Sequence, residues 1–356
     1  MYKRKKVLIC PLSWGLGHAT RDVLIIRKLI EHDFEVVIGA SGYSLEFLRK
    51  EFPLLKFYNI SGYSVRYSKS TTQLIKMLLL IPRILIWTIK EHYILSKLVK
   101  DHKIDIIISD NRFGLWNRNS YSIFVTHQLR VKFPGILKIF EIIFQGLSSF
   151  FIKNYDECWI PDFKEELNLS GGLSHLKKIP KNVIFVGPLS RFEYLQTNNC
   201  EKSIDVLFML SGPEPQRSIF ENIIYRQTKN SSLRCEIVRG TLTERENKFK
   251  FPVYDISESN KLHELISKSE MVVCRSGYSS VMDLFSIGKK AVLVPTPGQT
   301  EQEYLAKYLS QKKYFYSVSQ KEFNIEEDIK QVYDSIKITI KEKSKLEERI
   351  LCLKER

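Results

Sequence analysis

Residues 7–22, VLICPLSWGLGHATRD, decide the fold class of this 356-residue chain. The first four, Val7–Cys10, are apolar and predict a short buried strand. Ser13–Thr20 follows as a loop with two glycines, and a helix is predicted to begin near Arg21 and Asp22. This order of strand, loop and helix is typical of the opening of a Rossmann-like unit, in which the loop and the helix N-terminus can bind an anion.

The same order recurs in the second half of the chain. Val206–Leu210 predicts another buried strand, SGPEPQR at residues 211–217 predicts the loop, and a helix follows. A polar break at residues 187–200 separates the halves, and short apolar runs alternate with longer amphipathic stretches in both. That alternation is typical of a parallel sheet covered by helices. The sequence therefore predicts an α/β protein of two Rossmann-like domains that face each other across a ligand-binding cleft.

The same patterns predict the domain boundaries. Residues 1–190 are expected to form the N-terminal domain and residues 200–335 the C-terminal domain. A charged, amphipathic helix is predicted from about Glu326 to Glu355. Its last part, residues 336–356, is expected to pack across the two domains.

Composition excludes several classes of protein. With 44% hydrophobic residues and only 16 glycines and 12 prolines, the chain is neither disordered nor collagen-like. Its six cysteines include no Cys-x-x-Cys pair, which argues against a disulfide framework or a zinc site and favours the reducing cytosol. The apolar run after the first basic residues is too short for a signal peptide, and no run reaches the ~18 residues of a membrane span.

The balance of charge points to an anionic partner. Lys and Arg number 55 against 40 Asp and Glu, which gives a formal net charge of +15. Nucleic acid, the phosphates of a nucleotide and an acidic membrane surface are the partners that such a surplus favours.

Part of the surplus lies in residues 66–103, where basic residues recur every seven positions. Lys69, Lys76, Arg83, Lys90 and Lys97 therefore share one stripe of a helix. Pro82 is predicted to divide the segment into two helices. With Trp87 and neighbouring Leu and Ile residues, the stripe is typical of a membrane-surface helix, and Phe133–Phe151 could extend that surface. The alternative is a solvated row of charge on a helix whose apolar face lies in the core.

Three ionisable residues stand at or just after the ends of predicted strands in the N-terminal half: His18, Asp110 and His127. The carboxyl ends of parallel strands gather at one edge of a sheet, so these side chains are expected to face the same cleft. His18 is the preferred general base, because an imidazole in a phosphate-type loop is well placed to take a proton. Asp110 or His127 would orient His18 or the acceptor. A structural His127, bonded to a backbone carbonyl, is an equal alternative.

The loop around Gly15 and Gly17 does not match a nicotinamide-binding motif. The third glycine of GxGxxG is missing, and Gly39–Ser41 stands where an acid would be needed at the end of the second strand. Taken alone, the loop is equally typical of a structural turn and of a phosphate cradle.

Two stretches in the C-terminal half have the character of ligand-binding loops. In CRSGYSSVMD, residues 274–283, the N–H groups of a helix start could bind a diphosphate while Asp283 accepts from ribose. In VPTPGQTEQEY, residues 294–304, Gln302 and Glu303 follow a rigid loop and could bond sugar hydroxyls. Each stretch has a plain alternative, namely an ordinary turn between strand and helix, and a solvated helix start.

Taken together, these motifs resemble the GT-B glycosyltransferases of family 28, including the type that adds N-acetylglucosamine to the lipid-linked peptidoglycan precursor. VVCRSG at 272–277 matches the family's motif, with Asp283 in place of the usual Glu and Gln302-Glu303 where two Gln are common. Three further matches are Gly17-His18 to a Gly-Gly-His loop, Val186–Pro188 to a Gly-x-Pro hinge, and residues 211–217 to a phosphate loop with two prolines inserted.

That resemblance implies a nucleotide sugar donor, with uridine diphosphate as the expected nucleotide. Asp283 would hold the ribose, and Gln302 and Glu303 the hydroxyls of the donor sugar. The other donor-binding residues are expected around the diphosphate: Gly17, Ser211, Gly212, Gln216, Arg217, Arg275, Ser276, Gly277, Ser279 and Ser280. Because the sequence has no Asp-x-Asp metal motif, Arg217, Arg275 and backbone N–H groups would stabilise the leaving diphosphate, and no metal or other cofactor is expected.

The sequence therefore predicts an inverting glycosyltransferase in the cytosol, at the inner face of the cell membrane. It would move a hexose or N-acetylhexosamine from a nucleoside diphosphate sugar to a hydroxyl of a lipid-linked or saccharide acceptor. A nucleotide-sugar epimerase of the same architecture is the first alternative, and it would release free epimerised nucleotide sugar. A basic nucleic-acid-binding protein is the second, although the sequence has no RNA-binding aromatic motif or zinc finger.

Overall fold

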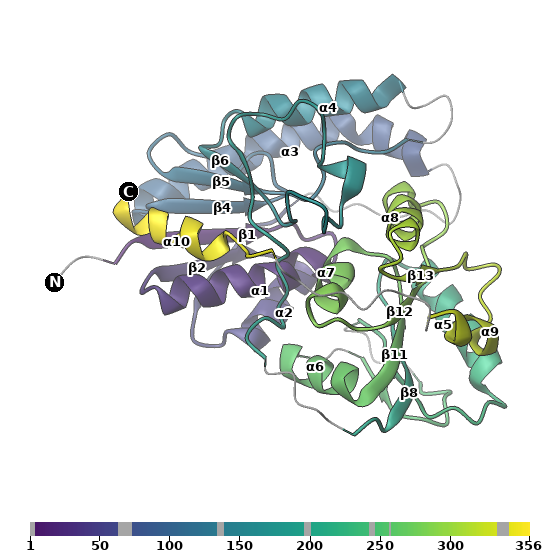
Figure 1. Ribbon diagram of the computed structural model, residues 1–356. Helices are drawn as coiled ribbons and strands as arrows, with labels where there is room; N and C mark the ends of the chain where they lie inside the picture. The colour runs from purple at the N-terminus through teal and green to yellow at the C-terminus, as the bar shows by residue number, and fades with distance from the viewer. Residues whose placement is uncertain are drawn as a thin grey trace. The chain divides into compact units, whose positions relative to one another are not determined.

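The computed structural model of the protein describes residues 4–62, 73–133, 139–195, 201–241, 246–255, 258–332 and 342–356, without the side chains of 73–81 and 139–140. The chain divides into two compact units (Figure 1). The N-terminal unit comprises Met1–Arg66, Thr72–Arg191 and Lys341–Arg356, and the C-terminal unit comprises Tyr67–Thr71 and Phe192–Ile340. The last stretch of the chain therefore returns to the N-terminal unit.

The N-terminal unit contains a parallel sheet in the order β3-β2-β1-β4-β5-β6-β7. Its strands are β1 Lys6–Pro11, β2 Glu35–Ala40, β3 Lys56–Asn59, β4 Ile106–Asp110, β5 Tyr121–Val125, β6 Glu157–Ile160 and β7 Val183–Phe185. Its helices are α1 Leu16–Glu31, α2 Gly42–Glu51, α3 Gln73–His102, α4 Ile139–Ile152 and α10 Leu346–Glu355. Helices α3 and α4 cover one face of the sheet, and α1 and α2 cover the other (Figure 1). Most side chains of the central strands are apolar because both faces of the sheet are buried.

The position of the site follows from this strand order. The chain leaves β1 toward β2 on one side, and β4 lies on the other side of β1, with Pro11 opposite Asp110. Loops that leave such neighbouring strands in opposite directions open a crevice at the carboxyl edge of the sheet. His18 lies in the first turn of α1, which follows β1, and Asp110 is the last residue of β4.

The C-terminal unit repeats this plan with the strand order β10-β9-β8-β11-β12-β13, again parallel. Its strands are β8 Ile204–Met209, β9 Cys235–Val238, β10 Val253–Tyr254, β11 Ser269–Cys274, β12 Ala291–Leu293 and β13 Tyr316–Ser317. Its helices are α5 Gln216–Thr228, α6 Ser259–Lys268, α7 Tyr278–Ser286, α8 Thr300–Gln311 and α9 Ile325–Gln331. Phe208, Phe220 and Phe323 pack together in its core. The prediction of an α/β protein with two Rossmann-like parallel sheets is confirmed.

Helix α3 differs from its prediction, because it continues through Pro82 as one helix. The expected division at this proline is wrong. Pro82 is exposed, so water can satisfy the backbone carbonyl that lacks its usual N–H partner. The inner side of α3 is held by Glu91, whose carboxylate accepts from Arg112 Nε at 3.1 Å and Nη2 at 2.9 Å.

The predicted continuous helix at the C-terminus is also wrong. Helix α9 ends at Gln331 and α10 begins only at Leu346, with residues 342–345 outside any helix. There the hydroxyl of Ser344 and the N–H of Lys345 both donate to the carbonyl of Val186, at 2.7 and 3.0 Å. These two bonds hold this part of the chain outside a helix. Helix α10 then contacts the N-terminal unit, where Glu347 pairs with Lys28 at 2.8 Å.

Candidate active site

The crevice between β1 and β4 gathers the ionisable residues that the sequence singled out. Gly15 is the N-cap of α1, so His18 lies in the first turn of that helix, at the carboxyl edge of the sheet. Its Nδ1 lies 2.9 Å from Oδ1 of Asp110. Asp110 is completely buried, whereas 17% of the His18 side chain remains exposed. The pair therefore joins a buried carboxylate to an imidazole that solvent or a ligand can reach.

Arg21 lies one helical turn after His18 and holds the same carboxylate. Its Nε donates to Oδ2 of Asp110 at 2.6 Å, and its Nη2 donates to Oδ1. Burial by itself raises the pKa of Asp110, but Arg21 and His18 together hold that pKa well below its usual range. Asp110 is therefore an ionised, fixed counter-charge and not a proton acceptor at neutral pH.

The environment of His18 favours its neutral form. Burial lowers the pKa of His18, Asp110 opposes that shift, and Arg21 reinforces it. With Asp110 ionised, the Nδ1–H of His18 donates to the carboxylate and the lone pair lies on Nε2. A neutral imidazole held in this way can accept a proton at Nε2.

His127 joins the cluster from the loop after β5. Its Nδ1 lies 2.9 Å from Nη1 of Arg21. The structure thus brings together His18, Asp110 and His127, the three residues that the sequence placed at one edge. The sequence did not identify the residue that links them. Its signal is the i, i+3 spacing of Arg21 from His18, which places both on one face of α1.

A fourth charged residue, Asp22, is buried beside this cluster. Neither of its carboxyl oxygens has a hydrogen-bond partner among the described residues. Burial raises its pKa well above the usual value, and the charge of Asp110 raises it further, whereas Arg21 opposes the shift. Burial and the charge of Asp110 therefore favour the protonated form of Asp22. No pattern in the sequence distinguishes it from a solvated helix residue.

In the C-terminal unit, the equivalent crevice lies between β8 and β11. Gly277 is the N-cap of α7, and a Cβ built on it would meet nothing within 4 Å. The first turn of α7, which includes Ser279 and Ser280, thus begins beside open space, a setting suited to an anion. Asp283 lies further along α7 and is buried. On the other side of the crevice, Ser211 and Gly212 lie between β8 and α5.

The predicted sugar-binding residues hold their own loop in place. Gln302 Oε1 accepts from the backbone N–H of Thr296, and Glu303 Oε1 accepts from that of Gly298, both at 2.9 Å. The hydroxyl of Ser276 donates to the carbonyl of Gln302 at 2.8 Å, which ties the start of α7 to α8. These contacts shape the loop, and contact of the same residues with a sugar stays a prediction.

The two arginines expected at the diphosphate are both buried. Arg275 donates from Nη1 to the carbonyls of Val294 and Pro295, at 3.1 and 3.2 Å, and from Nη2 to the carbonyl of Gln216 at 3.0 Å. Burial lowers its pKa to about 10. Arg217 pairs with two acids, Glu214 and Glu221. Both guanidinium groups therefore stabilise the loops of the crevice, and their contact with phosphate stays a prediction.

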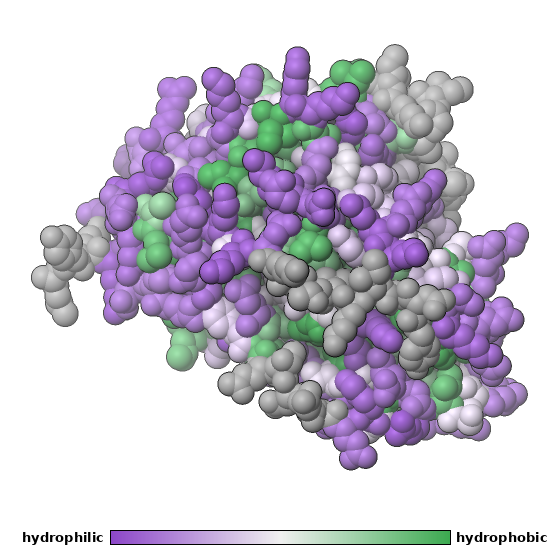
Figure 2. Space-filling model, viewed as in Figure 1, coloured by the Kyte–Doolittle hydropathy of each residue, from purple (hydrophilic) through white to green (hydrophobic). Residues whose placement is uncertain are grey.

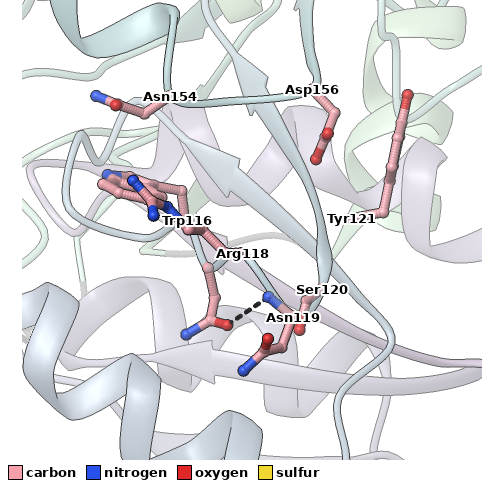
Figure 3. Close-up of a pocket in the computed structure, with 8 residues that line it drawn as sticks. Trp116, Arg118, Asn119, Ser120, Tyr121, Asn154 and Asp156 are labelled. Atoms are coloured by element: carbon pink, nitrogen blue, oxygen red, sulfur yellow. Dashed lines mark hydrogen bonds between the residues drawn. The ribbon is translucent and has the colours of Figure 1, made fainter.

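A separate depression lies away from these residues (Figure 3). It is lined by Trp116–Tyr121, Asn154 and Asp156, and the N–H of Asn119 donates to Oδ1 of Asn117 at 2.9 Å. Because Tyr121 begins β5 and Asp156 precedes β6, the depression lies at the amino edge of the sheet. It is thus opposite the edge that carries His18.

Neither a metal-binding cluster nor a membrane-spanning helix occurs in the described part of the chain. No group of three or more His, Cys, Asp or Glu side chains there is arranged to hold a metal ion. No helix among the same residues is long and apolar enough to cross a membrane.

Comparison with known proteins identifies related families. Residues 218–353 match the model of the glycosyltransferase family 28 C-terminal domain, and residues 6–131 match the model of glycosyl transferase family 1. An uncharacterized glycosyltransferase of Methanosarcina mazei is 23% identical over 87% of this chain and 84% of its own length. Another, of Methanosarcina acetivorans, is 21% identical over 87% of this chain and 84% of its own.

Solved structures share the fold at low sequence identity. The glycotransferase of kitacinnamycin is similar with a TM-score of 0.63 and 12% identity, over 99% of this chain and 95% of its own. MurG of Acinetobacter baumannii has a TM-score of 0.57 and 12% identity, over 99% of this chain and 100% of its own. The predicted resemblance to GT-B glycosyltransferases with a family 28 domain is confirmed.

Proposed function

Because this chain is a GT-B glycosyltransferase with a family 28 C-terminal domain, we propose that it is an inverting enzyme whose general base is His18. Its donor is a nucleoside diphosphate sugar, and it moves a hexose or N-acetylhexosamine to a hydroxyl of a lipid-linked or saccharide acceptor. The observation that carries the proposal is the contact between His18 Nδ1 and the buried carboxylate of Asp110 at 2.9 Å. That contact directs the basic nitrogen away from the core.

The reaction follows from the protonation states in the site. Nε2 of His18 takes the proton of the acceptor hydroxyl, and the freed oxygen forms a bond to the anomeric carbon. The bond between that carbon and the diphosphate oxygen breaks on the opposite face, and its electron pair leaves with the nucleoside diphosphate. Configuration inverts in this single displacement, and Asp110 stabilises the imidazolium that His18 becomes.

Related structures support a nucleotide sugar as donor. The spinosyn rhamnosyltransferase SpnG was solved with thymidine diphosphate, and an Arabidopsis thaliana relative of the fold with UDP-L-rhamnose. In this chain, the proposed donor site is the N-terminus of α7 with the open space beside Gly277. The diphosphate binds there, Asp283 bonds the ribose, and uridine is the expected nucleoside.

Thermal stabilisation by a panel of nucleotides and nucleotide sugars tests this proposal. A ligand at 100 times its dissociation constant adds ~2.7 kcal/mol to the stability of the protein that binds it. The donor that stabilises the wild type should stabilise Asp283→Ala far less, while Asp255→Ala, at a half-exposed acid of the same unit, serves as the control. Sugar transfer to an acceptor is the expected product. Free epimerised nucleotide sugar would instead establish the epimerase, and binding to nucleic acid alone would refute both.

The acceptor side of the proposal rests on an apolar surface of α3 and α4, visible in the upper part of Figure 2. Four large apolar residues on these helices are 65–76% exposed, namely Ile86, Ile89, Tyr93 and Ile142. Arg83, Lys90 and Lys97 are exposed on α3 as well, and Lys90 lies over the ring of Trp87 at 4.5 Å. Lys69 and the side chain of Lys76 lie outside the described residues. Apolar and basic groups on one pair of helices favour docking on an anionic membrane surface, which for this chain is the inner leaflet.

A vesicle-binding experiment tests the membrane surface separately from the chemistry. Changing Lys76, Arg83 and Lys90 to Gln should release the protein from anionic vesicles, because each basic residue contributes ~1 kcal/mol near such a surface. A control that changes Lys229, Lys312 and Lys321 of the C-terminal unit to Gln removes the same charge and should leave binding intact. If both variants bind equally, α3 is a solvated face and a soluble saccharide becomes the expected acceptor.

A further inference from the structure

Arg21 connects three side chains that come from three different elements. Its Nε and Nη2 bond Asp110 of β4, its Nη1 contacts His127 after β5, and its Nη2 lies 3.0 Å from Nδ1 of His18 on α1. Only 2% of Arg21 is exposed. A planar guanidinium in this position has donors in fixed directions and no acceptor. Arg21 is therefore the donor in every hydrogen bond that its guanidinium makes.

The direction of the bond to His127 determines the tautomer of that histidine. Nη1 of Arg21 can only donate, so Nδ1 of His127 must present its lone pair across the 2.9 Å contact. The proton of the neutral ring then lies on Nε2. In this form His127 has no lone pair at Nε2, and its Nδ1 is engaged by Arg21. His127 can therefore act as a hydrogen-bond donor through Nε2, but it cannot remove a proton.

His18 is held in the opposite tautomer. Its Nδ1 lies near both Asp110 Oδ1 and Arg21 Nη2, but these two groups already bond each other. If Nδ1 of His18 lacked a proton, its lone pair would face the carboxylate oxygen at 2.9 Å, which is repulsive. Donation from Nδ1 to the ionised carboxylate is therefore favoured, and the lone pair lies on Nε2.

We propose that Arg21 is a positioning residue that gives the two histidines opposite tautomers and so divides their roles. His18 is the base, and His127 is a neutral hydrogen-bond donor that cannot act as a base. The role of His18 rests on the proposed function, but the tautomers themselves belong to the free protein. Asp110 is the counter-charge through which Arg21 acts on His18.

The tautomers can be measured directly by NMR, without any substrate. In protein labelled with ¹⁵N at histidine, long-range couplings between ring nitrogens and ring carbon-bound protons distinguish Nδ1–H from Nε2–H, and His18→Gln and His127→Gln assign the signals. At neutral pH, we expect His18 with its proton on Nδ1 and His127 with its proton on Nε2. His127 found with a protonated Nδ1, as a tautomer or as a cation, would overturn the proposal.

Substitution of Arg21 tests whether this residue is the cause. In Arg21→Met, His127 should lose its single tautomer and give the averaged signals of an unconstrained ring. Arg21→Lys keeps the positive charge and serves as the second variant if Arg21→Met fails to fold. Its single ammonium cannot donate in the fixed directions of the guanidinium, so the same averaging is expected. Arg27→Met is the matched control on the same helix, because Arg27 pairs with Glu51. Unchanged His127 signals in a folded Arg21 variant would contradict the assignment.

Kinetics provide a second readout once the donor is known. His127→Gln retains a neutral N–H donor and should lower kcat/KM by no more than about tenfold, whereas His18→Gln removes the base and should lower it by ~10²–10⁴-fold. Loss of Arg21 also removes a charge that lowers the pKa of His18, so the acidic limb of the pH profile should move to higher pH. Equal losses in the two glutamine variants would refute the division of roles. Correct tautomers without any sugar transfer would refute only the proposed function.

Discussion

Asp110→Asn is the sharpest test of how the site is held together. The substitution replaces a buried carboxylate by an amide of the same shape. In the wild type this carboxylate accepts from Nε of Arg21 at 2.6 Å, from Nη2 of Arg21 and from Nδ1 of His18. Both Asp110 and Arg21 are almost inaccessible to solvent. The amide leaves the guanidinium charge without a counter-charge in a place where water cannot replace it.

The expected cost follows from that burial. Breaking a buried ion pair by removing one partner costs ~3–5 kcal/mol, and since the amide retains one acceptor oxygen, we expect the lower value. For a unit of this size, ~2–4 °C of melting temperature is lost for each kcal/mol, so the midpoint should fall by about 6–12 °C. Asp22 can reduce this loss, because its neutral carboxyl group can ionise and replace the missing charge. The double variant Asp22→Asn/Asp110→Asn removes that compensation, so its loss of stability relative to Asp22→Asn alone should show the whole effect.

Thermal and urea unfolding at pH 7 measure the loss of stability in the range where the contribution of Asp110 does not depend on pH. The pKa of Asp110 is lowered in the folded protein, so its contribution to stability is complete above its unfolded pKa of about 3.9 and is lost as the pH falls further. The difference in stability between Asp22→Asn and the double variant should therefore narrow in acid. Asp205→Asn is the control, because its pair with Arg234 is on the surface and is expected to contribute little. The reasoning would be refuted if the double variant lost no more stability relative to Asp22→Asn than Asp205→Asn loses relative to the wild type.

The remaining predictions concern catalysis and the donor. His18→Ala should lower turnover by ~10²–10⁴-fold and leave donor affinity unchanged in a calorimetric titration; near-normal turnover would remove His18 from the mechanism. Because the neutral imidazole is the active form and burial lowers its pKa below the usual 6.5, the acidic limb of kcat/KM should be centred below pH 6.5, so a limb centred above pH 7 would contradict the assignment. Asp283→Ala should weaken binding of the nucleoside diphosphate by ~1–3 kcal/mol, measured with the free nucleotide. EDTA should leave turnover unchanged, whereas inhibition that manganese reverses would show that a metal stabilises the leaving group.

Much of the architecture could be read from local patterns in the sequence. The two strand–loop–helix openings, at residues 7–22 and 206–217, predicted two parallel sheets, because buried strands and glycine-containing loops are encoded by neighbouring residues. The same rule placed His18, Asp110 and His127 together, since the carboxyl ends of parallel strands meet at one edge. The local patterns did not predict the uninterrupted α3 or the break before α10. These depend on which side of a helix faces water and on a carbonyl at Val186, far away in the sequence.

Protonation and pairing in the site were decided only by the tertiary structure. In the sequence, Arg21 and Asp22 are two adjacent charged residues in a helix start, a pattern that fits a solvated surface equally well. The pairing of Pro11 with Asp110 brings β4 against β1 and buries both charged residues. Arg21 then bridges two histidines, and burial raises the pKa of Asp22. Likewise, the sequence predicts that Arg217 and Arg275 are cations suited to a phosphate. In the structure, carboxylates surround Arg217 and carbonyls surround Arg275. The physical reason is that polarity patterns are local along the chain, whereas desolvation and charge pairing depend on distances of a few ångströms between residues that are remote in sequence.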